Sequence, residues 1–161
     1  MIPRQSAYTL KDSLGYRLTE LSGEMKAEMR RRVSEYGITT QQCAALIVLI
    51  RGRDLNVTHL ADGIGVDFGG TSRLVDRLET KGFVSTRSDG TDRRARRIEL
   101  SQTGRDLAEK AIAASRATNE LFLKRVTQKE AKQLREILEK LLEAPADQGA
   151  GPLGITEKMT S

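Results

Sequence analysis

The chain has 161 residues, which is enough for one domain or two closely joined lobes with an apolar core. Charged residues make up 30% of it and aromatic residues only 4%. This composition disfavours an aromatic-lined enzyme pocket and a platform that stacks single-stranded bases. The formal net charge is +5, and eight basic residues accompany four acidic ones between Thr71 and Arg97. Most of the excess charge therefore falls in one region, as in a nucleic-acid-binding surface.

Residue types that carry chemistry are few. Cys43 is the single cysteine, so cysteine usage is silent about disulfides, and with His59 as the single histidine these two residues cannot form a zinc site by themselves. We predict no metal and no cofactor. The sequence has no Ser/His/Asp or Cys/His arrangement and no Walker-type glycine loop, so we predict that the protein is not an enzyme. The longest apolar run, 43–50, is far shorter than the ~20 residues that span a bilayer. Residues 1–6 lack the apolar core of a signal peptide, and we expect a soluble, cytoplasmic protein with no membrane partner.

The first part of the chain predicts two helices. Over residues 10–36, apolar side chains recur every three or four positions, which indicates one long amphipathic helix that Gly37 ends. Thr39 and Gln42 have the spacing of a capping box and begin a second helix that runs through Ile50. This second helix is nearly all apolar, and we expect it to be buried.

The next two helices have the size and the connection of a helix-turn-helix. A short helix is expected over residues 58–64, with Thr58 as its cap. After a glycine-containing turn, Asp67 is the expected cap of a longer helix that runs to about Lys81. This longer helix is apolar on one face and polar on the other, and it takes the place of the recognition helix.

An arginine-rich hairpin follows. Residues 83–87 and 97–100 read as two strands that flank an Asp-Gly turn. Within five positions after the turn lie four arginines, namely Arg93, Arg94, Arg96 and Arg97. Guanidinium groups are planar, always charged and rich in donors, so a tight turn can bring several of them to phosphates or guanine edges together. The order helix, turn, helix and hairpin is that of a winged helix.

The rest of the chain returns to helix. One amphipathic helix reaches about residue 126, and a capping box formed by Thr127 and Glu130 begins a last, leucine-rich helix. The first and last helices are longer than one compact lobe needs, so we expect their apolar faces to meet a second copy of the chain. Residues 144–161 are rich in glycine, proline and small polar residues and are expected to form a flexible tail.

These motifs resemble the MarR family of bacterial transcription regulators over roughly residues 10–142. The matching stretches are Gly37–Gln42, Leu60–Val66, Ser72–Val84 and Asp92–Gly104. The resemblance implies a homodimer whose N- and C-terminal helices intertwine and hold two winged lobes over a pseudo-palindromic operator in double-stranded DNA. It also implies that small effectors, such as phenolic compounds, bind between the dimer helices and the DNA-binding lobes. Met25 and Met29 are expected to pack the dimer core or to line such a pocket.

The expected fold is mainly α with a small β-hairpin wing (α+β). Residues 1–36 form an N-terminal dimerisation helix, and residues 37–101 form the winged helix-turn-helix lobe. Residues 102–143 form C-terminal dimerisation helices, before the tail of residues 144–161.

The expected DNA contacts fall on the recognition helix and the wing. On the polar side of the helix, short hydroxyls suit phosphates and arginines suit guanine. Arg94 is the first choice for the minor groove, and the resemblance implies that Asp92 holds it in place. The full set is Thr71, Ser72, Arg73, Arg77, Asp92, Arg93, Arg94 and Arg96. The alternatives are that the wing is a solvated loop of charges and that Arg77 pairs with Asp76, Asp62 or Glu79.

Three further positions admit two readings each. Phe68, Gly69 and Gly70 depart from the family pattern, because two glycines weaken the start of a helix but let the backbone approach a phosphate. Phe68 is then a core residue and not a DNA wedge. Cys43 could be a peroxide-sensing thiol, but its apolar surroundings favour a buried, inert one. His59 is expected at the surface or on a phosphate and not on a metal.

The sequence therefore favours a sequence-specific transcriptional regulator, with a ligand-responsive repressor as the leading hypothesis. Such a protein is cytoplasmic and associates with the nucleoid when it is bound to DNA. A winged-helix adaptor for other proteins is one alternative, and an architectural protein that binds DNA without sequence preference is another. The arginine-rich wing argues against the adaptor, and only the ratio of specific to non-specific affinity separates the other two.

Overall fold

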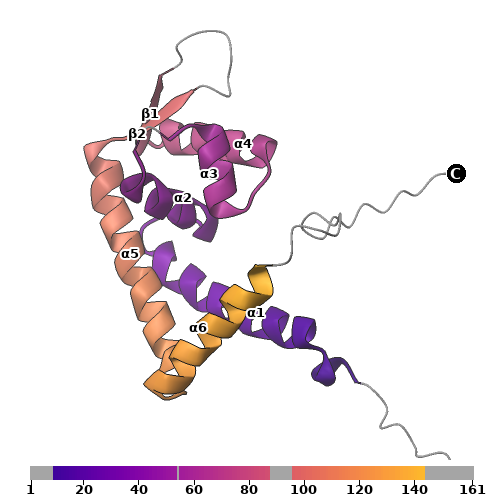
Figure 1. Ribbon diagram of the computed structural model, residues 1–161. Coiled ribbons are helices and arrows are strands. Elements are labelled where there is room, and N and C mark those ends of the chain that lie inside the picture. The colour runs from indigo at the N-terminus through magenta and orange to yellow at the C-terminus, as the bar shows by residue number, and fades with distance from the viewer. Residues whose placement is uncertain (1–8, 54, 88–95, 144–161) are drawn as a thin grey trace, which may run out of the picture. The chain divides into compact units, whose positions relative to one another are not determined.

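The computed structural model describes residues 9–53, 55–87 and 96–143 (Figure 1). Its elements are a 3-10 turn η1 (Leu10–Asp12), the helices α1 (Leu14–Ser34), α2 (Thr40–Arg51), α3 (Val57–Ile64) and α4 (Phe68–Thr80), the strands β1 (Val84–Arg87) and β2 (Arg97–Leu100), and the helices α5 (Gln102–Leu123) and α6 (Gln128–Leu142). A mostly helical chain with one two-stranded antiparallel sheet confirms the predicted fold class. The chain divides into two compact units, Met1–Phe122 and Leu123–Ser161, and each is described by itself.

Side-chain caps fix where most of the helices begin. The capping boxes of Thr39 with Gln42 and of Thr127 with Glu130 are both formed, as the sequence predicted. Asp67 caps α4, also as predicted, and its carboxylate accepts from the backbone N–H of Gly70 at 2.8 Å. Each cap satisfies an N–H group that the helix leaves without a partner.

Two predicted helix starts were wrong. The cap of α3 is Asn56, whose side chain accepts from the N–H of His59, so α3 begins before Thr58. Asn56 also forms an isolated β-bridge with Arg97, and this contact holds it in the extended conformation that a cap requires. The first helix does not run unbroken from Leu10, because Ser13 caps α1 after the separate 3-10 turn.

The core of the first unit joins α1, α2, α3, α4, the hairpin and α5. Its largest fully buried side chains are Leu46, Leu60, Leu78, Val33, Val57, Val75, Thr71 and Cys43. Each large apolar side chain that leaves water in this way contributes about 1.5–3 kcal/mol. In Figure 1, α2, α3 and α4 gather beside the strands at one end of α5. The buried side chains of α4 belong to this shared core, and their packing fixes the orientation of the opposite, solvent-facing side of the helix.

The two strands pair in one register, with Val84 opposite Leu100 and Arg87 opposite Arg97. β1 leads directly out of α4, through Gly82 with a φ of 71°. This conformation is one that glycine adopts without strain, so the chain can turn from the helix into the strand. The hairpin is therefore attached to the C-terminal end of α4 by a short, defined turn.

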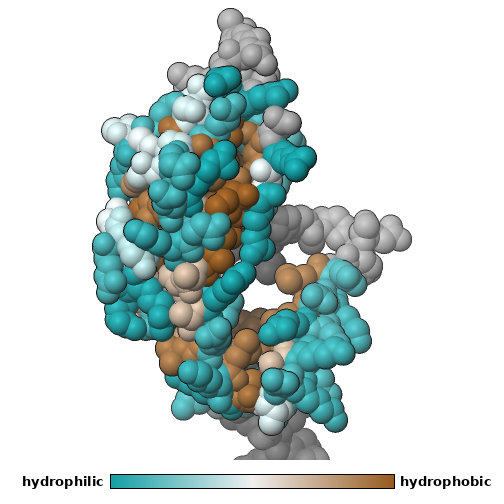
Figure 2. All heavy atoms as spheres, turned by 90° about the vertical axis from the view of Figure 1, so that its left-hand side faces the viewer, coloured by the Kyte–Doolittle hydropathy of each residue, from teal (hydrophilic) through white to brown (hydrophobic). Residues whose placement is uncertain are grey.

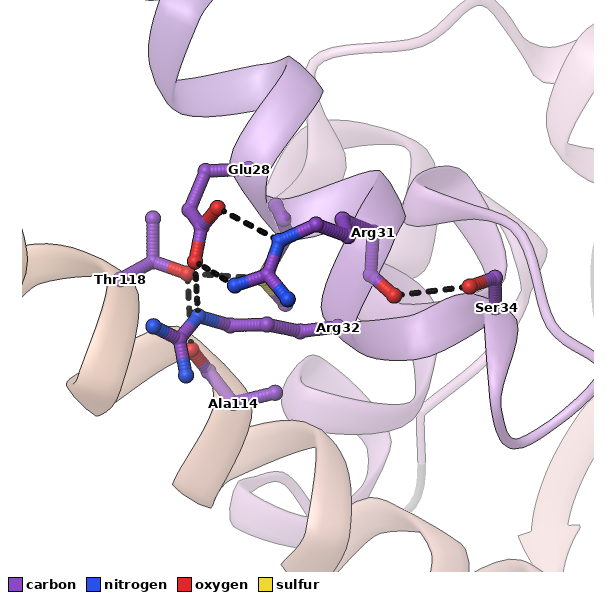
Figure 3. A network of polar contacts seen from close by, with 7 residues as sticks. Glu28, Arg31, Arg32, Ser34, Ala114 and Thr118 are labelled. Atoms are coloured by element: carbon purple, nitrogen blue, oxygen red, sulfur yellow. Dashed lines mark hydrogen bonds and ion pairs between the residues drawn. The ribbon is translucent and has the colours of Figure 1, made fainter.

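α1 and α5 meet through a polar cluster and a methionine (Figure 3). Glu28 binds Arg31 at 2.8 Å and Arg32 at 2.7 Å, and the hydrogen bond from Arg31 lowers the pKa of the Glu28 carboxyl below its usual value. Arg32 extends toward Ala114 and Thr118 of α5. The Thr118 hydroxyl donates to the Ala114 carbonyl at 2.9 Å and lies 3.7 Å from the sulfur of Met29 in α1.

Both units expose large apolar side chains among charged ones. Figure 2 shows apolar surface that reaches solvent between the charged groups on the face it draws. In the first unit the most exposed ones on η1 and α1 are Leu10, Leu14, Leu18 and Leu21. In the second unit α6 exposes Leu134, Ile137, Leu141 and Leu142, with Leu142 83% exposed. Apolar stripes of this kind on helices are typical of surfaces that pack against another chain.

Candidate nucleic-acid interface

The recognition helix α4 separates its residues into a buried and an open face. Leu74, Val75 and Leu78 are buried in the core, whereas Arg73 and Arg77 are exposed. Within the described part of the chain, neither guanidinium has a hydrogen bond or an ion pair. Arg77 therefore does not take the structural role that pairing with Asp76, Asp62 or Glu79 would have given it. The two arginines are available to a polyanion outside the protein.

Thr71 and Ser72 differ in what they can reach. Ser72 is half-buried and borders the open face. Thr71 is completely buried, and its hydroxyl donates to the Val66 carbonyl at 3.5 Å. Its hydroxyl is therefore unavailable to DNA, and Thr71 is corrected from a candidate DNA contact to a core residue.

The glycines at the start of α4 fit around its cap. A Cβ on Gly70 would lie 2.9 Å from a methyl group of Val66 and 3.0 Å from a carboxylate oxygen of Asp67. A side chain at position 70 would therefore have to displace the Val66 methyl group or the capping carboxylate of Asp67, which is a local reason for glycine that the sequence pattern did not reveal. Phe68 is partly buried and packs against the core, as expected for a core residue.

Arg96 joins the wing to the recognition helix. Its guanidinium binds the Asp76 carboxylate at 2.8 Å and also forms an ion pair with the Glu79 carboxylate. The Arg96 side chain is only 20% exposed. Arg96 was predicted as a DNA contact, but the structure gives its charged group two partners within the protein.

Lys81 is a second support that the sequence did not single out. Its ammonium donates to the Gly37 carbonyl at 2.7 Å and to the Gln42 side-chain oxygen at 3.5 Å. Gln42 is the buried member of the capping box at the start of α2. The C-terminal end of α4 is therefore fixed to the turn between α1 and α2. In the sequence, a lysine at the end of a helix looks like any other surface charge. The pattern around Lys81 therefore could not predict this long-range contact.

The predicted wing-tip residues Asp92, Arg93 and Arg94 lie outside the described residues. Their roles stay predictions. The described ends of the hairpin, Arg87 and Arg97, lie opposite each other in the sheet. The Arg87 guanidinium lies 3.6 Å from the Glu99 carboxylate on the same face of the sheet.

Cys43 and His59 are the remaining candidates for a reactive or metal-binding group. Cys43 is buried, its Sγ lies 3.9 Å from the Ala111 carbonyl, and loss of hydration raises the pKa of its thiol to about 11. His59 is exposed on α3, as predicted. Within the described residues, no group of three or more His, Cys, Asp or Glu side chains could hold a metal ion. None of the described helices combines the length and the apolar composition that crossing a membrane needs.

A cavity of about 400 Å³ lies between α1, α2 and α5 of the first unit. Its walls are mainly apolar. They are formed by Leu18, Leu21, Ser22, Met25, Lys26, Met29, Thr40, Cys43, Ala44, Ile47, Ser115, Thr118 and Asn119. Few convergent polar groups in a mainly apolar lining are typical of a site for a small organic molecule. Met25 and Met29 both belong to this lining.

Two helices joined by a short turn, with a hairpin directly after the second helix and open arginines on that helix, define a winged helix-turn-helix protein. The family comparison narrows this class: residues 36–95 match the model of the MarR family. These residues of the chain are therefore a MarR family domain, and the resemblance seen in the sequence is confirmed.

Relatives along most of the chain carry names of the same kind. The HTH-type transcriptional repressor MdtR of Bacillus subtilis is 26% identical over 140 residues, which cover 87% of this chain and 90% of MdtR. The crystal structure of the Mycobacterium tuberculosis MarR family protein Rv2887 in complex with salicylic acid is 27% identical, covers 80% of this chain and 96% of that one, and has a TM-score of 0.63. The MepR–DNA complex of Staphylococcus aureus covers 83% of this chain and 97% of that one, with a TM-score of 0.72 and 22% identity, a likeness that shows the fold.

Proposed function

We propose that the protein is a sequence-specific transcriptional regulator that represses its targets by binding double-stranded DNA. The observation that carries this proposal is the open face of α4, where Arg73 and Arg77 are exposed and have no partner among the described residues. Arginine forks bind guanine edges in the major groove, which admits one helix. The hairpin after α4 then brings Arg93 and Arg94 to the neighbouring minor groove.

The active form is a homodimer on a pseudo-palindromic operator. The apolar side chains that α1 and α6 expose supply the surface for a second copy, so residues 1–36 and 102–143 serve dimerisation. Two copies related by a two-fold axis place their recognition helices in successive major grooves about 34 Å apart. The protein then works in the cytoplasm, on the DNA of the nucleoid.

The relatives support repression as the direction of the effect. MdtR and Rv2887 are both named transcriptional repressors, and MepR has been solved bound to DNA. None of these is named as an enzyme. An adaptor without a nucleic-acid partner would not explain two open arginines on the recognition helix.

The effector is a small aromatic molecule of the phenolic type. The cavity between α1, α2 and α5 has a volume of about 400 Å³, and Met25 and Met29 give it an adaptable apolar wall. Lys26 and Asn119 add a cation and an amide at its lining, which suit a carboxylate or a hydroxyl. Rv2887 has been solved with salicylic acid, a molecule of this chemistry. Release from DNA follows because the ligand stabilises a conformation that fits the operator less well.

The first test is a fluorescence-anisotropy titration at near-physiological salt. The protein is titrated onto its own upstream intergenic DNA and onto a scrambled duplex of equal length. A preference of about 1,000-fold or more supports the regulator. Equal affinity for both duplexes supports an architectural protein, and no binding to either contradicts the DNA-binding proposal and supports the adaptor.

The effector proposal has its own test on the same operator duplex. Salicylate is added to the preformed protein–DNA complex. The salicylate concentration that releases half of the protein from the DNA is compared between the wild type and Met25→Trp, which fills the cavity. Met25→Leu is the matched control, because it keeps the side-chain volume close to that of methionine. Release of the wild type and the control but not of Met25→Trp supports the proposal, and equal behaviour of all three contradicts it.

A further inference from the structure

We propose that Glu79 and Arg96 form a clasp that positions the wing relative to the recognition helix, so that tight operator binding requires a negative charge on the DNA-binding lobe. This inference rests on the proposed function. It assigns Glu79 and Arg96 to positioning and not to DNA contact. From its sequence, Arg96 was expected among the DNA contacts, so the clasp changes its expected role from contacting DNA to positioning the wing.

The arginine side of the clasp is already occupied. One terminal nitrogen of Arg96 binds Asp76 Oδ1 at 2.8 Å, and the other forms the ion pair with Glu79 Oε2. Asp76 and Glu79 are three positions apart on α4, so they lie on one face of the helix and fit the two arms of one guanidinium fork. Both terminal nitrogens of Arg96 are therefore engaged within the protein, and its side chain is only 20% exposed to an outside anion.

The carboxylate side of the clasp contacts β1 and the residue that leads into β2. The second oxygen of Glu79 accepts from the backbone N–H of Thr86 at 2.9 Å and from the Thr86 hydroxyl at 2.8 Å. Thr86 belongs to β1, and Arg96 directly precedes β2. One carboxylate on α4 therefore fixes the hairpin on both sides of the segment that carries Arg93 and Arg94.

The clasp predicts that removing the Glu79 charge lowers the affinity for the operator, whereas electrostatic repulsion alone predicts that it raises this affinity. DNA is a polyanion, so a carboxylate on the recognition helix repels it. Removal of that carboxylate should by charge alone tighten binding to any duplex. If Glu79 holds the wing in place, its removal instead weakens operator binding while it still favours non-specific binding.

The experiment compares Glu79→Gln with Glu99→Gln in the titration on operator and scrambled duplexes. Glu99 is the matched control, because it is also a carboxylate of this lobe and lies exposed on β2, where its one ion pair among the described residues is with Arg87 at 3.6 Å. Both variants lose one negative charge. We expect Glu79→Gln to weaken operator binding about tenfold, the scale of one lost groove contact, and not to weaken binding to the scrambled duplex. Glu99→Gln should bind both duplexes as tightly as the wild type or more tightly.

A second variant keeps the charge of the clasp and removes its geometry. Arg96→Lys leaves a cation that can still bind a phosphate but lacks the planar fork whose two nitrogens each bind one carboxylate. If Arg96 positions the wing, this variant loses operator affinity about as much as Glu79→Gln, and the double variant loses little more than either single one, because both remove one interaction. If Arg96 instead binds phosphate directly, Arg96→Lys stays close to the wild type.

The outcomes separate the clasp from the proposed function and from misfolding. A variant that fails to fold loses both duplexes together with its helical circular-dichroism signal, and the charge-conserving Arg96→Lys then decides. The clasp is overturned if Glu79→Gln binds the operator as tightly as Glu99→Gln, or if Arg96→Lys matches the wild type. A wild type without preference for the operator overturns the proposed function, and the clasp with it.

Discussion

Gly104 lies where the winged lobe continues into α5, and its replacement by alanine should destabilise the protein. A Cβ at this position would overlap the backbone carbonyl of Phe83. That carbonyl also accepts from the N–H of Ser101 at 3.1 Å and from its hydroxyl at 3.2 Å. The Ser101 hydroxyl in turn accepts from the Gly104 N–H at 3.0 Å. An added methyl group therefore pushes α5 away from the hairpin at a point where backbone meets backbone.

The magnitude follows from the opposing effects. Overpacking of a tight site costs about 1–3 kcal/mol, and each weakened hydrogen bond costs about 1 kcal/mol. The helix propensity of alanine returns at most about 1 kcal/mol. The net loss is about 2 kcal/mol, which lowers the melting temperature of a chain of this size by roughly 4–8 °C.

The assay is thermal unfolding followed by circular dichroism at one fixed protein concentration. Gly23→Ala is the matched control, because Gly23 is a glycine of α1 whose Cβ would meet no atom within 4 Å. It should raise the melting temperature by roughly 2–4 °C, through helix propensity alone. Equal shifts for the two variants, or a stabilised Gly104→Ala, would refute the claim that α5 and the hairpin are in close backbone contact.

Three more predictions concern the DNA contact, the dimer and the thiol. Arg73→Ala should weaken operator binding by about 1–3 kcal/mol and relax sequence preference if it reads a base, whereas an unchanged affinity in the anisotropy titration would remove it from the interface. Leu141→Glu on α6 should shift the protein from dimer to monomer by light scattering, while Glu139→Gln should leave the dimer intact; a dimeric Leu141→Glu would exclude this stripe as the dimer surface. Maleimide should label Cys43 slowly at pH 7 and fully in denaturant, because burial raises the pKa of its thiol to about 11, and rapid labelling of the native protein would contradict the buried site. Since the unfolded thiol loses its proton at a lower pH than the folded one, this group should also reduce stability as the pH rises from about 9 to 11.

Local patterns in the sequence predicted what depends on near neighbours. The capping boxes at Thr39 and Thr127 and the Asp67 cap involve residues three positions apart, and all three form. The cap of α3 was misplaced, because Asn56 and Thr58 are both suitable capping residues. The choice between them depends on a bridge from Asn56 to Arg97, which lies far along the chain.

In the candidate site, too, the sequence predicted what depends on near neighbours and missed what depends on distant contacts. The amphipathic pattern of α4 placed Arg73 and Arg77 on its open face, and the structure agrees. It could not place Thr71, because a small residue at the border of the two faces is buried or exposed according to what packs beside it. It also could not pair Arg96, because several arginines and several carboxylates lie within reach of one another and only the register of the hairpin selects the partners.

A count of basic residues therefore overstates the part of this lobe that meets DNA. The Lys81 ammonium donates a hydrogen bond to the Gly37 carbonyl, and the Arg96 guanidinium forms ion pairs with Asp76 and Glu79. Lys81 thus ties down the end of α4, and under the proposed clasp Arg96 does the same for the base of the wing, so both would act by positioning the open arginines. Because one lobe contains both kinds of cation, substitutions that conserve charge distinguish them better than alanine does. Lysine should substitute poorly for an arginine that bridges two carboxylates, but adequately for one that only neutralises a phosphate.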